Sequence, residues 1–321
     1  MKPIIRYPME ACELKIRSLL SFMGKQETIS LLCFLAQGSN TLVYKGRYKG
    51  KPCVIKELFP EGLAEKEVLI RTRNGKIIVN FAIKNFMLWN KEKRRFKRAL
   101  RINYLLRKSP ELYTKIARFC KLYKTNGTFY LISDETEGRS WDTITEESIK
   151  RIIGIGFLIA QMTDAIHRTG WLVVDIKASN YIIIDQKTEL PRVKLVDFDS
   201  MIPHKRMNRP QQYRCSSETA PPELLQGLHQ NIGLHSDVYS IVAMLFYKLT
   251  QNQVSEKWPQ VYAQWEKENL SSWKTVYKSQ LKKIMEKALE RDVKKRMRSC
   301  SELSEALKFI LNKRGRTYED L

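Results

Sequence analysis

The sequence lacks any apolar run long enough to cross a membrane. Its longest candidates, residues 152–162 and 241–247, are shorter than the roughly 18 residues that suggest a membrane span. The N-terminal residues also lack the basic-then-apolar layout of a secretory signal. We therefore expect a cytoplasmic protein without a membrane span.

Cysteine is scarce, and no two cysteines have the C-x-x-C spacing of a zinc or redox motif. The chain has six, at positions Cys12, Cys33, Cys53, Cys120, Cys215 and Cys300. Their scatter argues against a structural zinc site and against a disulfide framework, and it fits a reducing cytosol.

Acidic residues are few: 34 Asp and Glu stand against 57 Lys and Arg, and the net charge is +23. The densest basic run, residues 91–108, contains a single acid, Glu92. It could bind nucleic acid or acidic lipid. Its apolar residues recur at near-helical spacing, at Phe96, Leu100, Ile102, Leu105 and Leu106. We favour a solvated helix face over a nucleic-acid surface, because no recognition motif accompanies the charge.

The first half of the chain has the pattern of a β-sheet with one long helix. Apolar runs of strand length occur at residues 31–36, 42–48, 52–58, 117–124 and 128–133. Residues 68–81 alternate around an Asn-Gly pair, which is the strongest short signal of a β-hairpin. Residues 84–108 are predicted to form the helix. Residues 1–30 have weak periodicity, and we expect an N-terminal extension with one short helix at 10–23.

After Gly138 the pattern becomes mainly helical. Helices are predicted at residues 146–168, 237–249, 258–269, 281–290 and 301–311. The sequence therefore predicts an α+β fold with two lobes. A small β-rich N-lobe at 31–138 contains the long helix, and a larger, mainly helical C-lobe at 139–312 precedes a tail at 313–321.

Three groups of polar residues stand at the ends of apolar runs. Lys56 ends one run, and taken alone it is most simply a strand-end charge. The loop from Asp175 to Asn180 places the polar side chains of Asp175, Lys177 and Asn180 between two apolar runs, as a functional loop does. Asp197-Phe198-Asp199 follows a third run. These two carboxylates could form a turn, or they could be oxygen ligands for magnesium.

The order of these groups resembles that of the eukaryotic-type protein kinase family. Lys56 is similar to the lysine of its V-A-I-K motif. Asp175, Lys177 and Asn180 match D-x-K-x-x-N, and Asp197 matches the first residue of D-F-G. Later segments resemble A-P-E at 220–223, S-D-V-W-S at 236–240 and D-x-x-x-R at 292–296. The resemblance covers residues 31–311 and implies the bilobal protein kinase-like fold.

The resemblance also implies roles for single residues. Asp175 would accept the proton of the substrate hydroxyl, and Lys177 would steady the transferring phosphate. Asn180 and Asp197 would hold Mg²⁺. ATP would be bound by a wider set that comprises Gly38, Val43, Lys56, Asp134, Thr136, Asn180 and Asp197.

The expected activity is a serine/threonine protein kinase that uses ATP and Mg²⁺ and has a protein substrate. Lys177 together with Ser216, in the segment before the A-P-E-like motif, is the pattern of the serine/threonine members. Glu223 and Arg296 are expected to form a structural ion pair and to take no part in the chemistry.

Several positions depart from the family pattern. In the glycine-rich loop, Ala36 and Thr41 replace two of the three glycines, and only Gly38 remains. Val174 replaces the arginine before the catalytic aspartate, so basal activity is not expected to need a phosphorylated activation segment. Asp199 replaces the glycine of D-F-G.

Two more departures concern the segment after Lys56. Residues 59–81 form an insert where the family has a short connection. The predicted helix contains a single acid, Glu92, which lies early for the usual partner of the lysine.

Two alternative functions stay open. A pseudokinase that scaffolds partners is favoured by the eroded glycine loop and by the absent helix glutamate. It is opposed by the retained residues Lys56, Asp175, Asn180 and Asp197. A small-molecule phosphotransferase, similar to aminoglycoside or choline kinases, would also use a D-x-D such as Asp197-Phe198-Asp199. Against it stand Glu223, Asp237 and Arg296, which in the resembled family belong to the peptide-substrate architecture.

Overall fold

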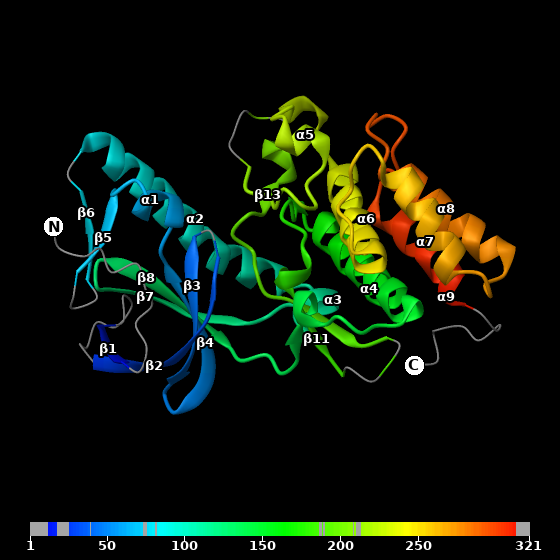
Figure 1. Ribbon diagram of the computed structural model, residues 1–321. Helices are drawn as coiled ribbons and strands as arrows, with labels where there is room; N and C mark the ends of the chain where they lie inside the picture. The colour runs from blue at the N-terminus through cyan, green and yellow to red at the C-terminus, as the bar shows by residue number, and fades with distance from the viewer. Residues whose placement is uncertain are drawn as a thin grey trace. The chain divides into compact units, whose positions relative to one another are not determined.

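The chain forms two compact units, one rich in strands and the other mainly helical (Figure 1). This computed structural model describes residues 12–17, 26–38, 40–72, 76–80, 82–185, 188, 190–207, 209 and 213–312. The first unit comprises residues 1–107 and 117–136, and the second comprises residues 108–116 and 137–321. The predicted α+β class is confirmed.

The first unit is built on an antiparallel sheet in the order β1-β2-β3-β4-β8-β7. Its strands are β1 (Cys12–Arg17), β2 (Gln26–Gln37), β3 (Thr41–Tyr48), β4 (Lys51–Leu58), β7 (Phe119–Thr125) and β8 (Thr128–Asp134). Asn126 and Gly127 join β7 to β8 with φ of 49° and 76°, the left-handed values that a tight hairpin turn requires. Gly127 is also sterically required, since a Cβ there would lie 2.0 Å from the carbonyl oxygen of Ile77.

The helix predicted at residues 10–23 is wrong, because this segment contributes strand β1. Cys12 pairs with Leu31 and Arg17 pairs with Gln26 across the β1–β2 ladder. Backbone hydrogen bonds to a neighbouring strand can order a segment whose side-chain periodicity is too weak for a helix. Strand β2 starts at Gln26, so the expected start of the N-lobe at residue 31 falls inside a strand.

The predicted long helix is confirmed as α2 (Ile83–Leu106). Its buried side chains recur every three or four residues and include Trp89, Phe96, Ala99, Ile102 and Leu106. Its exposed basic residues include Lys91, Arg94, Lys97 and Arg101. Leu105, expected among the apolar residues of the helix, is 37% exposed. The helix thus has one apolar side and one basic side.

The insert at 59–81 contains α1 (Glu61–Ala64) and the antiparallel strands β5 (Leu69–Arg71) and β6 (Ile77–Val79). The expected hairpin is therefore present, while its Asn-Gly turn lies outside the described residues. Arg71 binds Glu57 of β4, with 2.9 Å between guanidinium nitrogen and carboxylate oxygen. The hydroxyls of Tyr44 and Tyr130 donate to the same carboxylate at 2.7 and 2.8 Å.

This ion pair is deeply buried, with Arg71 2% exposed and Glu57 fully buried. Burial disfavours the charge on Arg71, but the Glu57 carboxylate outweighs this effect, so the pKa of Arg71 is raised. Burial, and then the charge of Glu57, raise the pKa of Tyr130 well above its ordinary value. The insert is thus held to the sheet through a charged pair that water does not reach.

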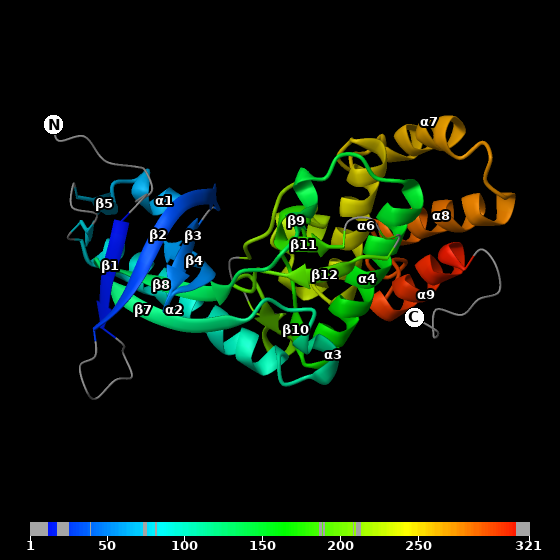
Figure 2. The ribbon, with the colours of Figure 1, turned by 90° about the horizontal axis from the view of Figure 1, so that it is seen from below.

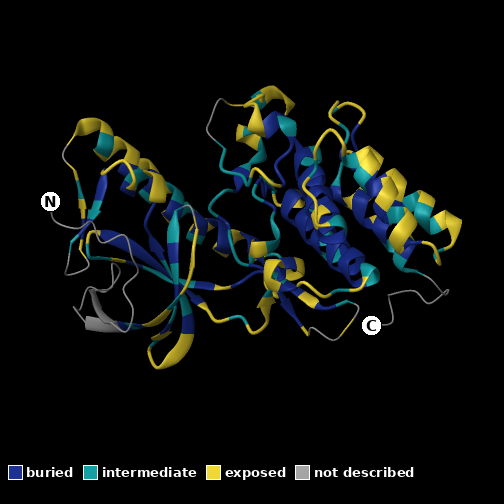
Figure 3. Cartoon of the chain, viewed as in Figure 1, coloured by how far each residue is buried: buried dark blue, intermediate teal, exposed yellow. Residues whose placement is uncertain are grey.

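The second unit packs its helices around α4 (Ile149–Arg168) and α6 (Leu234–Thr250), which are largely buried (Figure 3). The remaining helices are α3 (Pro110–Tyr113), α5 (Pro222–Leu225), α7 (Trp258–Asn269), α8 (Thr275–Ala288) and α9 (Cys300–Leu311). A Cβ at Gly156 of α4 would lie 2.6 Å from the Leu245 side chain of α6, so the glycine lets these two helices approach closely. Among the described residues, no helix has the length and apolar character needed to span a membrane.

Short strands of the second unit carry the loops of interest. Strands β9 (Arg139–Ser140), β11 (Tyr181–Ile184) and β12 (Arg192–Leu195) form one sheet beside α4 (Figure 2). Strands β10 (Trp171–Leu172) and β13 (Ile202–Pro203) form a second pair. Short 3-10 helices occur at Trp141–Thr143, Ala178–Asn180, His204–Arg206 and His229–Asn231.

We predict that Arg71→Met destabilises the first unit by about 3–5 kcal/mol, because it leaves the buried Glu57 carboxylate without its cation. Hydrogen exchange of the β4 and β8 amides measures this loss within the unit. Arg47→Met, at an exposed arginine of β3, is the control and should change stability by less than about 0.5 kcal/mol. Equal, small effects of both substitutions would contradict the role assigned to Arg71.

Candidate active site

The carboxylate of Asp237 anchors the segment that leads into the Asp175 loop. Asp237 lies in the first turn of α6 and is fully buried. It accepts hydrogen bonds from the backbone N–H groups of Val173 and Val174 at 2.8 and 2.9 Å. Nε2 of His167 lies 2.8 Å from the same carboxylate and must carry the proton, because a carboxylate can only accept.

Val174 has φ of 71°, in the left-handed region. This conformation costs about 1–2 kcal/mol for an ordinary residue and is least expected for a β-branched one. Val174 is 2% exposed, so the fold holds it there both by its buried side chain and by its bond to Asp237. The reversal of the chain at this point directs the next residue, Asp175, out of the core.

The Asp175 side chain is fixed on both sides. Oδ1 accepts the N–H of Ser216 at 2.8 Å, and Oδ2 lies 3.1 Å from Nζ of Lys177. The amide of Asn180 donates to the Asp175 carbonyl oxygen at 2.8 Å and to Oδ2 at 3.4 Å. The predicted residues Asp175, Lys177 and Asn180 are thus brought together in one cluster.

The charge of Lys177 is maintained by its neighbours. Burial disfavours it, but the Asp175 carboxylate outweighs burial, with further contributions from Asp197 and Asp199, so the pKa of Lys177 is raised. A permanent cation therefore stands among three carboxylates. A phosphate group approaching this cluster would meet a positive charge beside the potential proton acceptor.

Asn180 and Asp197 offer oxygen atoms of the type that magnesium binds. The N–H of Val196 donates to the Asn180 carbonyl at 3.0 Å, which ties the two strand ends together. Because the amide nitrogen of Asn180 is used by Asp175, its side-chain oxygen is the atom available as a ligand. The donor set therefore fits Mg²⁺, which needs few protein ligands. No group of three or more His, Cys, Asp and Glu residues suited to a metal occurs in the described part of the chain.

Asp199 does not have a positive φ, so the replacement of glycine at this position brings no left-handed strain. Its carboxylate accepts the Ser200 hydroxyl at 3.3 Å. The departure from D-F-G is therefore compatible with an ordinary backbone.

The segment after Ser216 is held by a hydrogen bond to the Asp175 loop and by a buried ion pair. The Thr219 hydroxyl donates to the Ile176 carbonyl at 2.6 Å. Arg296 binds both carboxylate oxygens of Glu223, at 2.6 and 3.1 Å, and both residues are buried. The expected structural ion pair is confirmed, and it holds the wall next to Asp175.

The predicted nucleotide-binding residues Gly38, Val43, Lys56, Asp134 and Thr136 all lie in the first unit. Val43 and Lys56 are direct cross-strand partners on β3 and β4, so their side chains share one face of the sheet. The N–H of Gly38 donates to the Thr41 carbonyl oxygen at 2.8 Å in the β2–β3 turn. Asp134 ends β8 and accepts the Cys120 thiol at 3.0 Å.

Glu57 follows Lys56 but points to the opposite face of β4, where it is committed to Arg71. Glu92 is buried on α2, with 4.0 Å between its carboxylate and the Arg95 guanidinium. Lys56 Nζ lies 5.7 Å from the centre of the Phe119 ring. Among the residues of α2, Glu92 is therefore the buried acid that remains as a partner for Lys56. Its early position in the helix argues against this role.

The set of residues predicted from the sequence lacked Asp237 and His167. Asp237 belongs to the S-D-V segment that resembles the family, so the sequence indicated that this position matters, but it did not indicate which groups Asp237 binds. His167 lies near the end of a predicted helix, and nothing in the sequence indicated a role for it. Asp237 binds the backbone before Asp175 directly, and His167 acts on it through the Asp237 carboxylate.

The chain belongs to the protein kinase family: the family described as "Protein kinase domain" matches residues 37–308. No curated protein matches the sequence. Among solved structures, the apo form of PpkA-294 is 16% identical with a TM-score of 0.63, covering 87% of this chain and 95% of that one. The kinase domain of PknI from Mycobacterium tuberculosis is 16% identical with a TM-score of 0.56, covering 88% and 96%. At this identity the structures show a shared fold.

We predict that Val174→Gly destabilises the protein less than Val173→Gly. Both valines are 2% exposed, so the loss of the buried side chain is similar, but only Val174 has a left-handed backbone. Glycine removes that strain, and the two free energies of unfolding should differ by about 1–2 kcal/mol. Urea unfolding of both variants measures the difference. A larger loss for Val174→Gly would show that the backbone there is not strained.

Proposed function

We propose that the protein is an active serine/threonine protein kinase that transfers the γ-phosphoryl group of ATP to protein hydroxyls. The single observation that carries this proposal is the fixed Asp175 carboxylate, held by the Ser216 N–H on one oxygen and by Lys177 on the other. A carboxylate fixed in this way can orient a hydroxyl and accept its proton.

In the transfer, the acceptor oxygen forms a bond to the γ-phosphorus while the bond from that phosphorus to the β–γ bridging oxygen breaks. Asp175 takes the proton of the hydroxyl, and Lys177 balances the charge of the moving phosphoryl group. Asn180 and Asp197 would hold magnesium, which when bound neutralises charge on the phosphates. Among the contacts described, the acceptor side of Asp175 is bounded by Ser216, and this supports a protein acceptor.

In the first unit, Val43 and Lys56 support a nucleotide site because they share one sheet face. Lys56 would bind the α- and β-phosphates, Gly38 would let the backbone approach them, and Asp134 and Thr136 would bind the adenosine end. Glu92 is our candidate for the acid that positions Lys56, since Glu57 is committed to Arg71.

The second candidate function is a pseudokinase, and the observation that favours it is the β2–β3 turn. Ala36, near the end of β2, and Thr41, at the start of β3, replace glycines on either side of this turn, so the backbone has less freedom to enclose phosphate. The cluster of Asp175, Lys177 and Asn180 favours the active enzyme, because a scaffold does not need a fixed proton acceptor beside a cation.

The test is incubation of the full chain with labelled ATP, magnesium and generic acceptor proteins, followed by phosphoamino-acid analysis. We expect phosphoserine and phosphothreonine. Asp175→Ala should lower the transfer rate about 10²–10⁴-fold and keep nucleotide binding, because the residue faces the acceptor. Asp197→Ala should lose magnesium-dependent nucleotide binding as well as transfer.

Asp142→Ala, at an exposed aspartate of the second unit, is the matched control and should keep the wild-type rate. Nucleotide binding without any transfer would establish the pseudokinase. Mainly phosphotyrosine, or phosphorylated small molecules without phosphoprotein, would contradict the proposed acceptor. Wild-type rates in both Asp175→Ala and Asp197→Ala would refute kinase chemistry at this site.

A further inference from the structure

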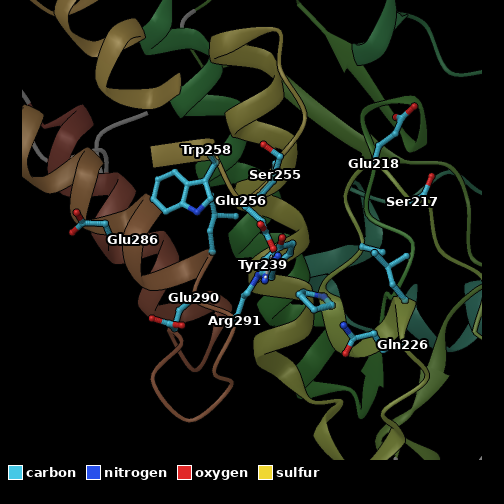
Figure 4. A pocket seen from close by; sticks show the side chains of 15 residues that line it. Ser217, Glu218, Gln226, Tyr239, Ser255, Glu256, Trp258, Glu286, Glu290 and Arg291 are labelled. Carbon is cyan, nitrogen blue, oxygen red and sulfur yellow. Dashed lines mark hydrogen bonds and ion pairs between the residues drawn. The ribbon is translucent and has the colours of Figure 1, made fainter. Parts of the chain in front are cut away.

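A groove with a volume of about 620 Å³ opens next to the segment that holds Asp175 (Figure 4). All of its lining belongs to the second unit. One wall is the segment from Ser217 to Pro222, and the opposite wall is the end of α8 with the residues that follow it. Tyr239 of α6 and Trp258 of α7 lie between the walls.

The groove has an apolar floor. Ala220, Tyr239 and Leu289 are buried, and Val254 and Trp258 are half-buried. These side chains offer an aromatic and aliphatic surface to an occupant, while most of their own area is already packed. An apolar side chain could therefore be taken up without rearranging the core.

The groove is acidic although the protein is strongly basic. Its lining includes four glutamates, Glu218, Glu256, Glu286 and Glu290, and one cation, Arg291. Lysine and arginine exceed acids by 57 to 34 in the chain, so this local excess of carboxylates runs against the overall charge. It creates a negative potential that selects a cationic partner.

Two of these carboxylates are already engaged. Glu256 lies 3.2 Å from the Arg291 guanidinium, and the Glu290 carboxylate accepts the Asp292 N–H at 3.0 Å. Within the described part of the chain, Glu218 and Glu286 have no ion pair or hydrogen bond in the structure. They stand on opposite walls of the groove and do not point toward one another (Figure 4), so each can separately serve a guanidinium or ammonium group of an occupant.

The groove continues directly from the catalytic cluster. Ser216 donates its N–H to Asp175, and the next residue, Ser217, lines the groove. An extended segment advances about 3.3 Å per residue. A polypeptide with its hydroxyl at Asp175 therefore reaches the groove within a few residues.

Contacts within the second unit hold the walls of the groove in place. Arg296 binds Glu223 at 2.6 Å and lies 5.0 Å from the centre of the Tyr239 ring. Trp258 packs edge-to-face on Phe246, with 6.2 Å between ring centres. A preformed groove loses little freedom on binding, and this favours affinity for a short segment.

We propose that this groove is the docking site of the protein acceptor and that it takes a basic side chain next to an apolar one, a few residues from the phosphorylated hydroxyl. The inference rests on the proposed function. The arginine or lysine pairs with one of the two glutamates, Glu218 or Glu286, and the apolar side chain packs on Tyr239 and Trp258.

The experiment uses neutral peptides with a single serine, in which an Arg-Leu pair is placed at each of about five positions on either side, a span of about 16 Å of extended chain. We expect wild-type protein to prefer one position by about tenfold in kcat/KM over the peptide without the pair. In the double variant Glu218→Lys, Glu286→Lys this preference should disappear, mainly through a higher KM.

The control is the double variant Glu146→Lys, Glu305→Lys, which makes the same charge change at exposed glutamates outside the groove. It should keep both the preference and the rate. Loss of the preference in the control to the same extent would show an effect of net charge and would overturn the proposal. An equal preference in wild type and groove variant would overturn it too.

Binding of a dye-labelled Arg-Leu peptide to Asp175→Asn, followed by fluorescence anisotropy, separates this proposal from the proposed function. Tight binding that the groove substitutions weaken about tenfold supports the docking site even when no peptide is phosphorylated. Phosphorylation of all peptides at one rate, with no difference in binding, refutes the docking site and leaves kinase activity standing.

Discussion

Three hydrogen bonds to one buried carboxylate organise the catalytic loop. Asp237 receives the N–H groups of Val173 and Val174 and the imidazole of His167. The first two bonds fix the backbone at the residue where the chain turns into its left-handed conformation, directly before Asp175. Removing the acceptor would leave two buried N–H groups unpaired, and each costs about 1–3 kcal/mol. The strained conformation at Val174 persists because the surroundings determine it, and the position of Asp175 follows from it.

The same principle recurs at two buried ion pairs. Arg71 holds the insert to β4 through Glu57, and Arg296 holds the segment after Ser216 through Glu223. Buried pairs of this kind add little net stability compared with apolar packing, but breaking one is costly, so they specify a single arrangement. In this chain one pair determines where the insert lies, and the other shapes the acidic groove beside the site. These two ion pairs account for two of the glutamates, Glu57 and Glu223, that are buried in a strongly basic protein.

Much of the fold could be predicted from local sequence patterns. A helix or strand that buries one face has apolar residues at regular spacing, and this spacing is visible in the sequence. The helices α2, α4, α6, α7 and α9 and the strands β3, β4 and β8 lie close to where the spacing of apolar residues predicts them. The helix predicted at 10–23 was wrong because β1 is ordered by backbone pairing with β2. Such pairing does not require a periodic pattern of apolar residues within β1 itself. The positions of Asp175, Lys177 and Asn180 in one cluster were predictable because they share a loop.

The contacts that shape the site were not predictable, because they join residues far apart in the chain. Val173 meets Asp237 and Ser216 meets Asp175 only after the second unit has folded. The left-handed backbone at Val174 contradicts the local preference of valine, which is why no sequence signal announces it. The groove likewise draws its lining from segments between Ser217 and Arg291, and its acidity is hidden by the net charge of the chain.

The most direct test of the account is the phosphoryl transfer rate of Asp237→Asn, measured together with its thermal unfolding. Asparagine keeps the shape of the side chain but replaces one accepting oxygen with an N–H₂ group, so one backbone N–H or the His167 N–H faces a donor. We predict that the variant still unfolds cooperatively and that transfer falls at least about tenfold, with nucleotide binding retained. An Asp237→Asn protein that transfers phosphate at the wild-type rate would contradict the claim that this carboxylate sets the geometry of Asp175.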